Sequence, residues 1–301
     1  MDFKIGDEIE EVDETEEEEQ RNSKFPLIVA IIIALVVGVS VFVICYHFFG
    51  PKKQKEEPIQ ATQLDLQEDN VQILYAYVTY GTKNERNDKF VKDAHVTLDS
   101  FSNVEKYYYA LQFAQVEDFV FTNKYNEKNQ KIYLISNAKI KEYMERFFGS
   151  QVSYSTNNVI TYPFSFRING QNVGIMTYSS AKNGFETVFD GYEENVVSDK
   201  LVEPYYTVLE SAQKNPDGSY ELHEKIIYTS VEEAGGVYTV HIYKDYGHAM
   251  EIETKPNQTE EMLKANPINV NNYKDKASTI TYLFRLNGTT LYFDSSKIVF
   301  S

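Results

Sequence analysis

The feature that most constrains this chain is a run of 22 residues without a charged side chain, residues 25–46. At the α-helical rise such a run spans roughly 33 Å, which matches the hydrocarbon thickness of a lipid bilayer. Backbone amides in lipid must be satisfied within the segment, so we expect this run to be helical. Aromatic residues follow it, and Lys52, Lys53 and Lys55 can reach lipid headgroups. We therefore predict a transmembrane helix over residues 25–49, with the lipid bilayer as the partner of this segment.

The apolar run has the character of an uncleaved anchor. A signal peptide has a shorter apolar core that ends in a small-x-small site, whereas this run ends in Val43-Ile44-Cys45-Tyr46. Cys45 is the only cysteine of the chain, which excludes an intramolecular disulfide framework and a multi-cysteine metal cluster. Its place at the membrane edge also fits palmitoylation, but a small apolar residue within a membrane helix is the simpler explanation.

The orientation of the anchor does not follow from its basic flanks. Three basic residues precede the run and three follow it within a short distance, so the positive-inside rule gives a tie. A long C-terminal domain can be translocated largely regardless of its charge. We therefore expect a single-pass cell-membrane protein with a cytoplasmic N-terminus and a C-terminal domain outside the membrane.

The rest of the chain divides into an acidic tail, a stalk and a folded part. Residues 1–24 contain 11 acidic and 3 basic side chains, which predicts a disordered cytoplasmic tail that is either merely solvated or docks on a basic partner. Residues 50–70 are polar and contain two prolines, which is typical of a stalk. The net charge of −16 argues against nucleic acid as a partner.

Alternating β-branched and aromatic residues indicate a β-rich α+β domain. Val71–Tyr80 is predicted to be a strand, and capping signatures at Ser102 and Ser136 predict two helices. Because Tyr107, Tyr108 and Tyr109 cannot all face one side of a helix, Tyr109 is expected to be exposed or to cover a neighbouring strand. Hairpins are predicted over residues 116–136, 160–178, 205–229, 237–254 and 280–293, and a short helix near 260–264.

Two hairpins have similar sequences. ITYPFSFRING (160–170) resembles ITYLFRLNG (280–288), and the first hairpins of the two halves align around Lys-Asn turns at 83–84 and 214–215. We interpret residues 71–192 and 200–301 as two β-rich modules, a tandem duplication of a hairpin–helix–hairpin unit. The alternative is that hairpins with Asn-Gly turns are common and that these two arose separately.

No motif in the sequence indicates a chemical activity. The sequence has no phosphate-binding glycine loop, no nucleophile elbow and no dinucleotide fingerprint. Ser136 and Lys139 fit a serine–lysine pattern, but Ser136 as a helix N-cap explains the same residue. The five histidines lack zinc-binding spacing, although His241 and His248 flank one hairpin. We therefore predict no catalytic, cofactor-binding or metal-ligating residue, and no cofactor.

Tyrosine is the most unusual feature of the composition, with 24 residues and no tryptophan. Tyrosine is suited to recognition surfaces, but it is equally suited to half-buried strands. A structural role on such strands is the simpler explanation of the tyrosine content. Asn257 and Asn287 fit the glycosylation acceptor pattern, and the second also fits a tight turn.

The sequence favours a non-catalytic extracytoplasmic binding or scaffolding protein of the cell envelope. Its partner would be an unidentified envelope protein or surface ligand. Two alternatives stay open, a membrane-anchored hydrolase that acts on cell-wall polymers and a regulator of a membrane sensor kinase.

Overall fold

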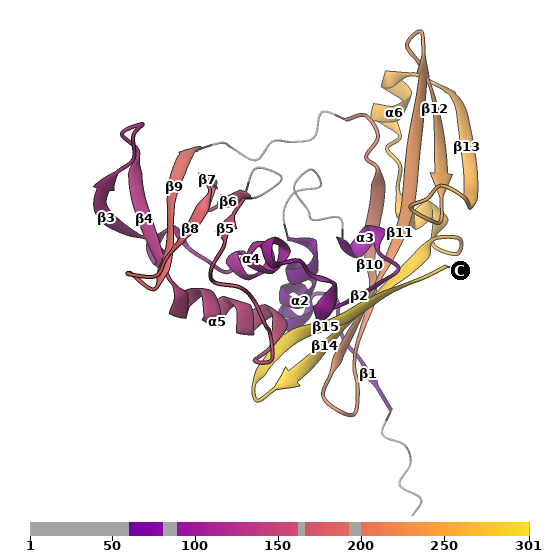
Figure 1. Cartoon of the computed structure of the whole chain (residues 1–301). Helices are drawn as coiled ribbons and strands as arrows, with labels where there is room; N and C mark the ends of the chain where they lie inside the picture. Colours follow the sequence, from indigo (N-terminus) through magenta and orange to yellow (C-terminus); the bar gives the residue numbers. More distant parts are fainter. Residues whose placement is uncertain (1–59, 81–88, 162–165, 193–199, 301) are drawn as a thin grey trace, which may run out of the picture. The chain divides into compact units, whose positions relative to one another are not determined.

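The computed structural model describes residues 60–80, 89–161, 166–192 and 200–300 (Figure 1). Gln60–Ser301 forms one compact unit. The predicted acidic tail and the predicted transmembrane helix over residues 25–49 lie outside the described residues. Within the described ranges, no helix has both the length and the apolar character that crossing a bilayer requires.

The unit is a β-rich α+β fold with two antiparallel sheets. The large sheet has the strand order β1-β10-β11-β14-β15-β2, and β12 and β13 continue it from the far half of β11. Its strands are β1 (Thr62–Gln63), β2 (His95–Thr97), β10 (Tyr205–Lys214), β11 (Tyr220–Ala234), β12 (Val237–Tyr243), β13 (Glu251–Gln258), β14 (Ser278–Asn287) and β15 (Thr290–Val299).

The small sheet has the order β3-β4-β9-β7-β6, and β8 pairs with β9 and with β5. Its strands are β3 (Val120–Tyr125), β4 (Lys131–Ser136), β5 (Val159–Ile160), β6 (Phe166–Ile168), β7 (Gln171–Val173), β8 (Met176–Ser179) and β9 (Gly184–Tyr192).

Helices fill the space between the two sheets (Figure 1). They are α2 (Asp69–Thr79), α3 (Lys89–Lys92), α4 (Asn103–Leu111) and α5 (Asn137–Phe148), while α6 (Glu260–Ala265) lies beside β12. The ring of Tyr107 on α4 packs 5.1 Å from that of Phe185 in the small sheet. The ring of Phe147 on α5 packs 5.7 Å from that of Phe293 in the large sheet. Aromatic side chains thus connect both sheets through the helical layer.

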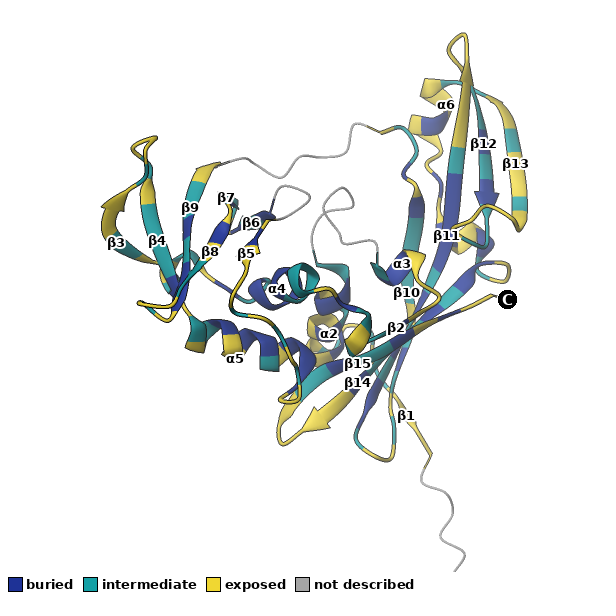
Figure 2. Ribbon diagram, viewed as in Figure 1, coloured by how far each residue is buried: buried dark blue, intermediate teal, exposed yellow. Residues whose placement is uncertain are grey.

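Strand β11 separates two hydrophobic clusters. Its residues Leu222, Ile226 and Tyr228 face the helical layer and belong to the main cluster. Ile227 faces the opposite side and belongs to a second cluster with residues of β12, α6 and the 3₁₀ turn Val270–Tyr273. Figure 2 shows the contrast between the buried middle of β11 and the exposed β13. The large sheet is therefore covered on both faces along part of this strand.

Both predicted helix caps are confirmed. The Ser102 hydroxyl accepts a hydrogen bond from the backbone N–H of Glu105, and the Glu105 carboxylate accepts one from the N–H of Ser102. The Ser136 hydroxyl accepts from the N–H of Lys139 at the start of α5. The predicted hairpins β3–β4, β10–β11, β12–β13 and β14–β15 are also present. The Asn169-Gly170 turn joins β6 to β7, after which the chain bends before β8.

The prediction of a strand over Val71–Tyr80 is wrong, because this segment forms most of helix α2. Its buried residues Val71, Leu74 and Val78 recur at helical spacing and enter the main cluster. The β-branched and aromatic composition suggested a strand, but packing between two sheets outweighs this weak preference. The alignment of the first hairpins of the two halves is therefore also wrong, since β10 is a strand where α2 is a helix.

Tyr109 is not exposed, and the three consecutive tyrosines of α4 are all buried. The prediction assumed one buried face, whereas α4 has neighbours on several sides. Tyr107 packs on Phe185 of the small sheet, Tyr108 lies 5.4 Å from Phe166, and Tyr109 stacks on Phe147 of α5. A helix enclosed in this way buries residues around most of its circumference.

The two predicted modules share contacts throughout the unit. Residues 62–63, from the predicted stalk, pair with residues 213–214 of β10. Strand β2 pairs with β15, and the main cluster contains side chains from both 71–192 and 200–301. The two sheets themselves come from different halves apart from β1 and β2.

Candidate functional site

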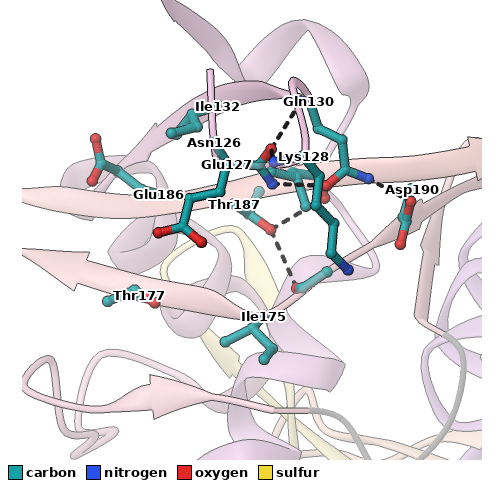
Figure 3. Close-up of a pocket in the computed structure, with 12 residues that line it drawn as sticks. Asn126, Glu127, Lys128, Gln130, Ile132, Ile175, Thr177, Glu186, Thr187 and Asp190 are labelled. Atoms are coloured by element: carbon teal, nitrogen blue, oxygen red, sulfur yellow. Dashed lines mark hydrogen bonds between the residues drawn. The ribbon is translucent and has the colours of Figure 1, made fainter. Parts of the chain in front are cut away.

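A groove of about 680 Å³ lies on the small sheet. Phe185 of β9 points toward helix α4, so its neighbours Glu186 and Val188 belong to the opposite, outer face of the strand. The groove follows this outer face between the β3–β4 turn and β8 (Figure 3). Its lining residues are Asn126, Glu127, Lys128, Gln130, Ile132, Gly174, Ile175, Thr177, Glu186, Thr187, Val188 and Asp190.

A network of side-chain amides fixes the turn above the groove. Asn126 Oδ1 accepts hydrogen bonds from the backbone N–H groups of Lys128 and Gln130, at 3.0 and 2.9 Å. Asn126 Nδ2 donates to Gln130 Oε1 at 2.7 Å, and Gln130 Nε2 donates to Asp190 Oδ1 at 2.7 Å. The turn is thereby joined to β9. Figure 3 shows the side chains of Glu127 and Lys128 extending from this turn toward β8.

The floor of the groove depends on a close approach between Gly174 and β9. The N–H of Gly174 donates to the carbonyl of Val188 at 3.0 Å, and the buried Thr187 hydroxyl donates to the carbonyl of Gly174 at 3.2 Å. A Cβ at position 174 would lie only 3.0 Å from Val188 Cγ2. The next residue, Ile175, is 56% exposed although its side chain is wholly apolar. The groove therefore combines a rigid floor with an uncovered apolar side chain.

Carboxylates dominate the charge of the groove. Its lining has three acidic residues, Glu127, Glu186 and Asp190, and one basic residue, Lys128. The Lys182 ammonium, from the turn between β8 and β9, lies 2.6 Å from Glu186 Oε1. The groove can therefore hold positive charge and hydrogen-bond donors, since carboxylates accept both.

The serine–lysine pattern of the sequence has a structural role here. Lys139 Nζ lies 3.1 Å from Glu142 and 3.7 Å from Asp118, while only the Lys139 backbone N–H contacts Ser136. The hydrogen bond to Glu142 raises the pKa of Lys139, so this lysine is protonated near neutral pH. A protonated lysine cannot act as the base that a serine nucleophile needs.

The histidines of the β12–β13 hairpin contact other side chains of the chain. His241 Nδ1 lies 2.9 Å from Glu251 Oε1, and the ring of His248 stacks on that of Tyr243 at 4.4 Å. His223 contacts Thr281 on the neighbouring strand. In the described ranges, no group of three or more histidine, cysteine and carboxylate side chains has a geometry that could hold a metal ion.

No family model matches the chain, no curated protein matches it, and no solved structure matches it.

The sequence did not point to the groove. Its lining comes from three separate stretches, residues 126–132, 174–177 and 186–190, which only the pairing of β9 with β4 and β8 brings together. The turn Asn126–Gln130 lies within the hairpin predicted over residues 116–136, but the amide contact of Gln130 with Asp190 spans 60 residues of sequence.

Proposed function

We propose that this chain is a membrane-anchored, non-catalytic binding protein of the cell envelope. Residues 25–49 hold it in the membrane as a single-pass helix, with its N-terminus in the cytoplasm. The described unit lies outside and receives a protein or surface ligand in the groove of the small sheet. The groove, with its exposed Ile175 and its carboxylates, is the observation that carries this proposal.

The contacts of the carboxylates support binding over catalysis. Acid–base hydrolysis of a glycosidic bond uses two carboxyl groups that face the bond, one of them protonated. In this groove Glu186 is ion-paired with Lys182, and Asp190 accepts a hydrogen bond from Gln130. Both carboxyl groups are therefore already engaged by side chains of the chain itself. The grouping of three carboxylates is nevertheless the one observation in favour of an anchored hydrolase, which therefore stays the second candidate.

A photo-crosslinking amino acid placed at Ile175 in the full chain tests the binding proposal in intact cells. We expect an adduct of defined mass at position 175 and none from the matched position Ile73, which is 47% exposed on α2. The adduct should disappear when Thr177, which lines the groove, is replaced by Trp. Adducts of equal yield at both positions, or none at either, would contradict a ligand in the groove.

Two further measurements separate the remaining alternatives. Cleavage of isolated cell-wall polymers that is lost in Glu186→Gln but kept in Glu142→Gln would establish a hydrolase instead. Replacement of residues 25–46 by an unrelated apolar helix tests regulation of a sensor kinase through the anchor, because a binding protein should keep its adduct at position 175. Full-length protein in a detergent-free high-speed supernatant would rule out the anchor.

A further inference from the structure

We infer that the groove receives lysine or arginine side chains from an extended segment of a partner polypeptide. This inference rests on the proposed function and names the ligand class of that same site. A lysine or arginine side chain has an apolar stem and a cationic head, and it commonly packs the stem on apolar surface while the head reaches polar groups. The groove offers a surface for each part.

The apolar part consists of Ile132, Ile175 and Val188. Ile132 of β4 and Val188 of β9 are paired residues in the register of the sheet, so their side chains lie together on the outer face. Ile175 adds the most exposed apolar side chain of the groove. Methylene groups of a bound lysine or arginine would remove part of this surface from water.

The polar part consists of carboxylates that have capacity for a further donor. Glu127 has no hydrogen-bond or ion-pair partner among the described residues, and Asp190 accepts one bond, at Oδ1, from Gln130. A carboxylate has about four acceptor positions, so each can take a guanidinium or an ammonium group. Figure 3 shows Glu127 extending from the turn across the groove, with Asp190 at the far side of Gln130.

The chain already places one lysine on a carboxylate of this groove. Lys182 Nζ lies 2.6 Å from Glu186 Oε1, and both side chains are about one-third exposed. This intramolecular pair shows that the outer face of the small sheet accommodates a lysine head on an acidic residue. A partner side chain at Glu127 and Asp190 would make the same kind of contact.

Lys128 is the one basic residue of the lining, so removal of its charge should change the affinity for a basic peptide in the opposite sense to removal of a carboxylate. Its side chain extends from the turn over the groove, as Figure 3 shows. A cation at this place repels a bound lysine or arginine. Removal of its charge should therefore strengthen binding of a basic peptide, whereas it would weaken binding of an acidic one.

The experiment uses the full chain in an uncharged detergent and a fluorescent peptide of alternating lysine and serine. Two control peptides replace lysine by norleucine, which keeps the stem without the charge, or by glutamate. We expect saturable binding of the lysine peptide, which weakens as ionic strength rises, and no binding of either control peptide.

Variants of the groove then assign the binding to named residues. The double variant Glu127→Gln/Asp190→Asn should weaken the lysine peptide about tenfold, which corresponds to about 1.4 kcal/mol. Lys128→Gln should strengthen it. The control Glu117→Gln/Glu233→Gln removes the same charge at two exposed positions elsewhere and should leave the affinity unchanged.

If the control double variant weakened binding of the lysine peptide equally, the effect would come from the overall negative charge of the protein, and the inference would be overturned. Absence of binding of the lysine peptide, or equal binding of the norleucine peptide, would also overturn it. If an adduct at Ile175 is found in cells together with any one of these three results, the proposed function stands and only the ligand class is rejected. If neither the adduct at Ile175 nor binding of the lysine peptide is found, both the proposed function and the ligand class are rejected.

Discussion

The phenolic oxygen of Tyr282 lies 2.6 Å from Oε2 of Glu224, whose side chain is fully buried under helix α2. Tyr75 of α2 donates to the other carboxylate oxygen, Oε1, at 2.5 Å. Glu224 lies in the middle of β11, opposite Ile280 of β14. Two tyrosines from distant parts of the chain thus bind one acidic residue in the interface between the helices and the large sheet.

Replacement of Tyr282 by Phe should therefore destabilise the fold. The buried carboxyl group of Glu224 would lose one of its hydrogen bonds, and a buried acceptor left without its partner costs about 1–3 kcal/mol. Urea unfolding followed by circular dichroism measures this free energy. Tyr125→Phe is the matched control, because Tyr125 is exposed on β3 and its loss of the hydroxyl should change the unfolding free energy little. A Tyr282→Phe variant as stable as the control would contradict the structural role of the pair.

Ser136 should behave as a helix cap and be replaceable by another capping residue. Ser136→Ala removes the acceptor for the Lys139 N–H and should lower the unfolding free energy by about 1 kcal/mol. Ser136→Asp supplies an equivalent acceptor and should keep stability near that of the wild type. If Ser136→Asp proved as unstable as Ser136→Ala, the capping explanation would fail.

Alkaline pH should reduce the contribution of Tyr143 to the unfolding free energy within a defined pH range. Burial, and then the hydrogen bond to Asp118, raises the pKa of Tyr143 to about 12 from an ordinary value of about 10. The stabilisation is therefore complete below pH 10 and is lost as the pH rises toward 12, because the unfolded chain ionises first. The difference in unfolding free energy between wild type and Tyr143→Phe should be largest at neutral pH and shrink across this window. A difference that stays constant across the window would contradict the assignment.

Acid should weaken the contact between Ser219 and Asp217 in the β10–β11 turn. The hydroxyl and the backbone N–H of Ser219 both donate to Asp217 Oδ1, and these bonds lower the pKa of Asp217 below its ordinary value. Their contribution to stability is present above about pH 4 and is lost as the pH falls through the lowered value. Ser219→Ala should therefore destabilise the protein at neutral pH and much less in acid. Thermal unfolding across this range provides the measurement, and a gap that widens in acid would refute it.

Gly184 should resist substitution because β9 passes close to β4 there. A Cβ at this position would lie 2.5 Å from the backbone carbonyl oxygen of Ile135. Gly184→Ala must shift one strand against the other and should lower the unfolding free energy by about 1–3 kcal/mol. Ser180→Ala, in the exposed turn before β9, is the control and should be close to neutral. Equal stability of the two variants would show that the strands can separate at little cost.

The elements that the sequence predicted correctly are those set by neighbouring residues. Ser102 and Ser136 bond to groups three residues away, so the local pattern contains the whole interaction. The same is true of the Asn169-Gly170 turn, whose two residues both have positive φ.

The errors concern segments whose conformation depends on distant neighbours. Val71–Tyr80 has the composition of a strand, and it becomes a helix because its apolar face packs on residues from both halves of the chain. Tyr109 is buried because α4 is enclosed, which a single helical face could not reveal. The groove was inaccessible to sequence reasoning for the same reason, since β4, β8 and β9 supply its floor.

Successive side chains of β11 point into two different hydrophobic clusters, which makes this strand sensitive to insertions and deletions. Ile226 and Ile227 are adjacent, yet they point to opposite faces and into different apolar interiors. Loss of one residue from the first half of the strand would send Leu222, Glu224 and Ile226 toward the wrong layer in a single step. Natural length variation should therefore be tolerated in the Asn215–Gly218 turn and purged from the strand that follows it.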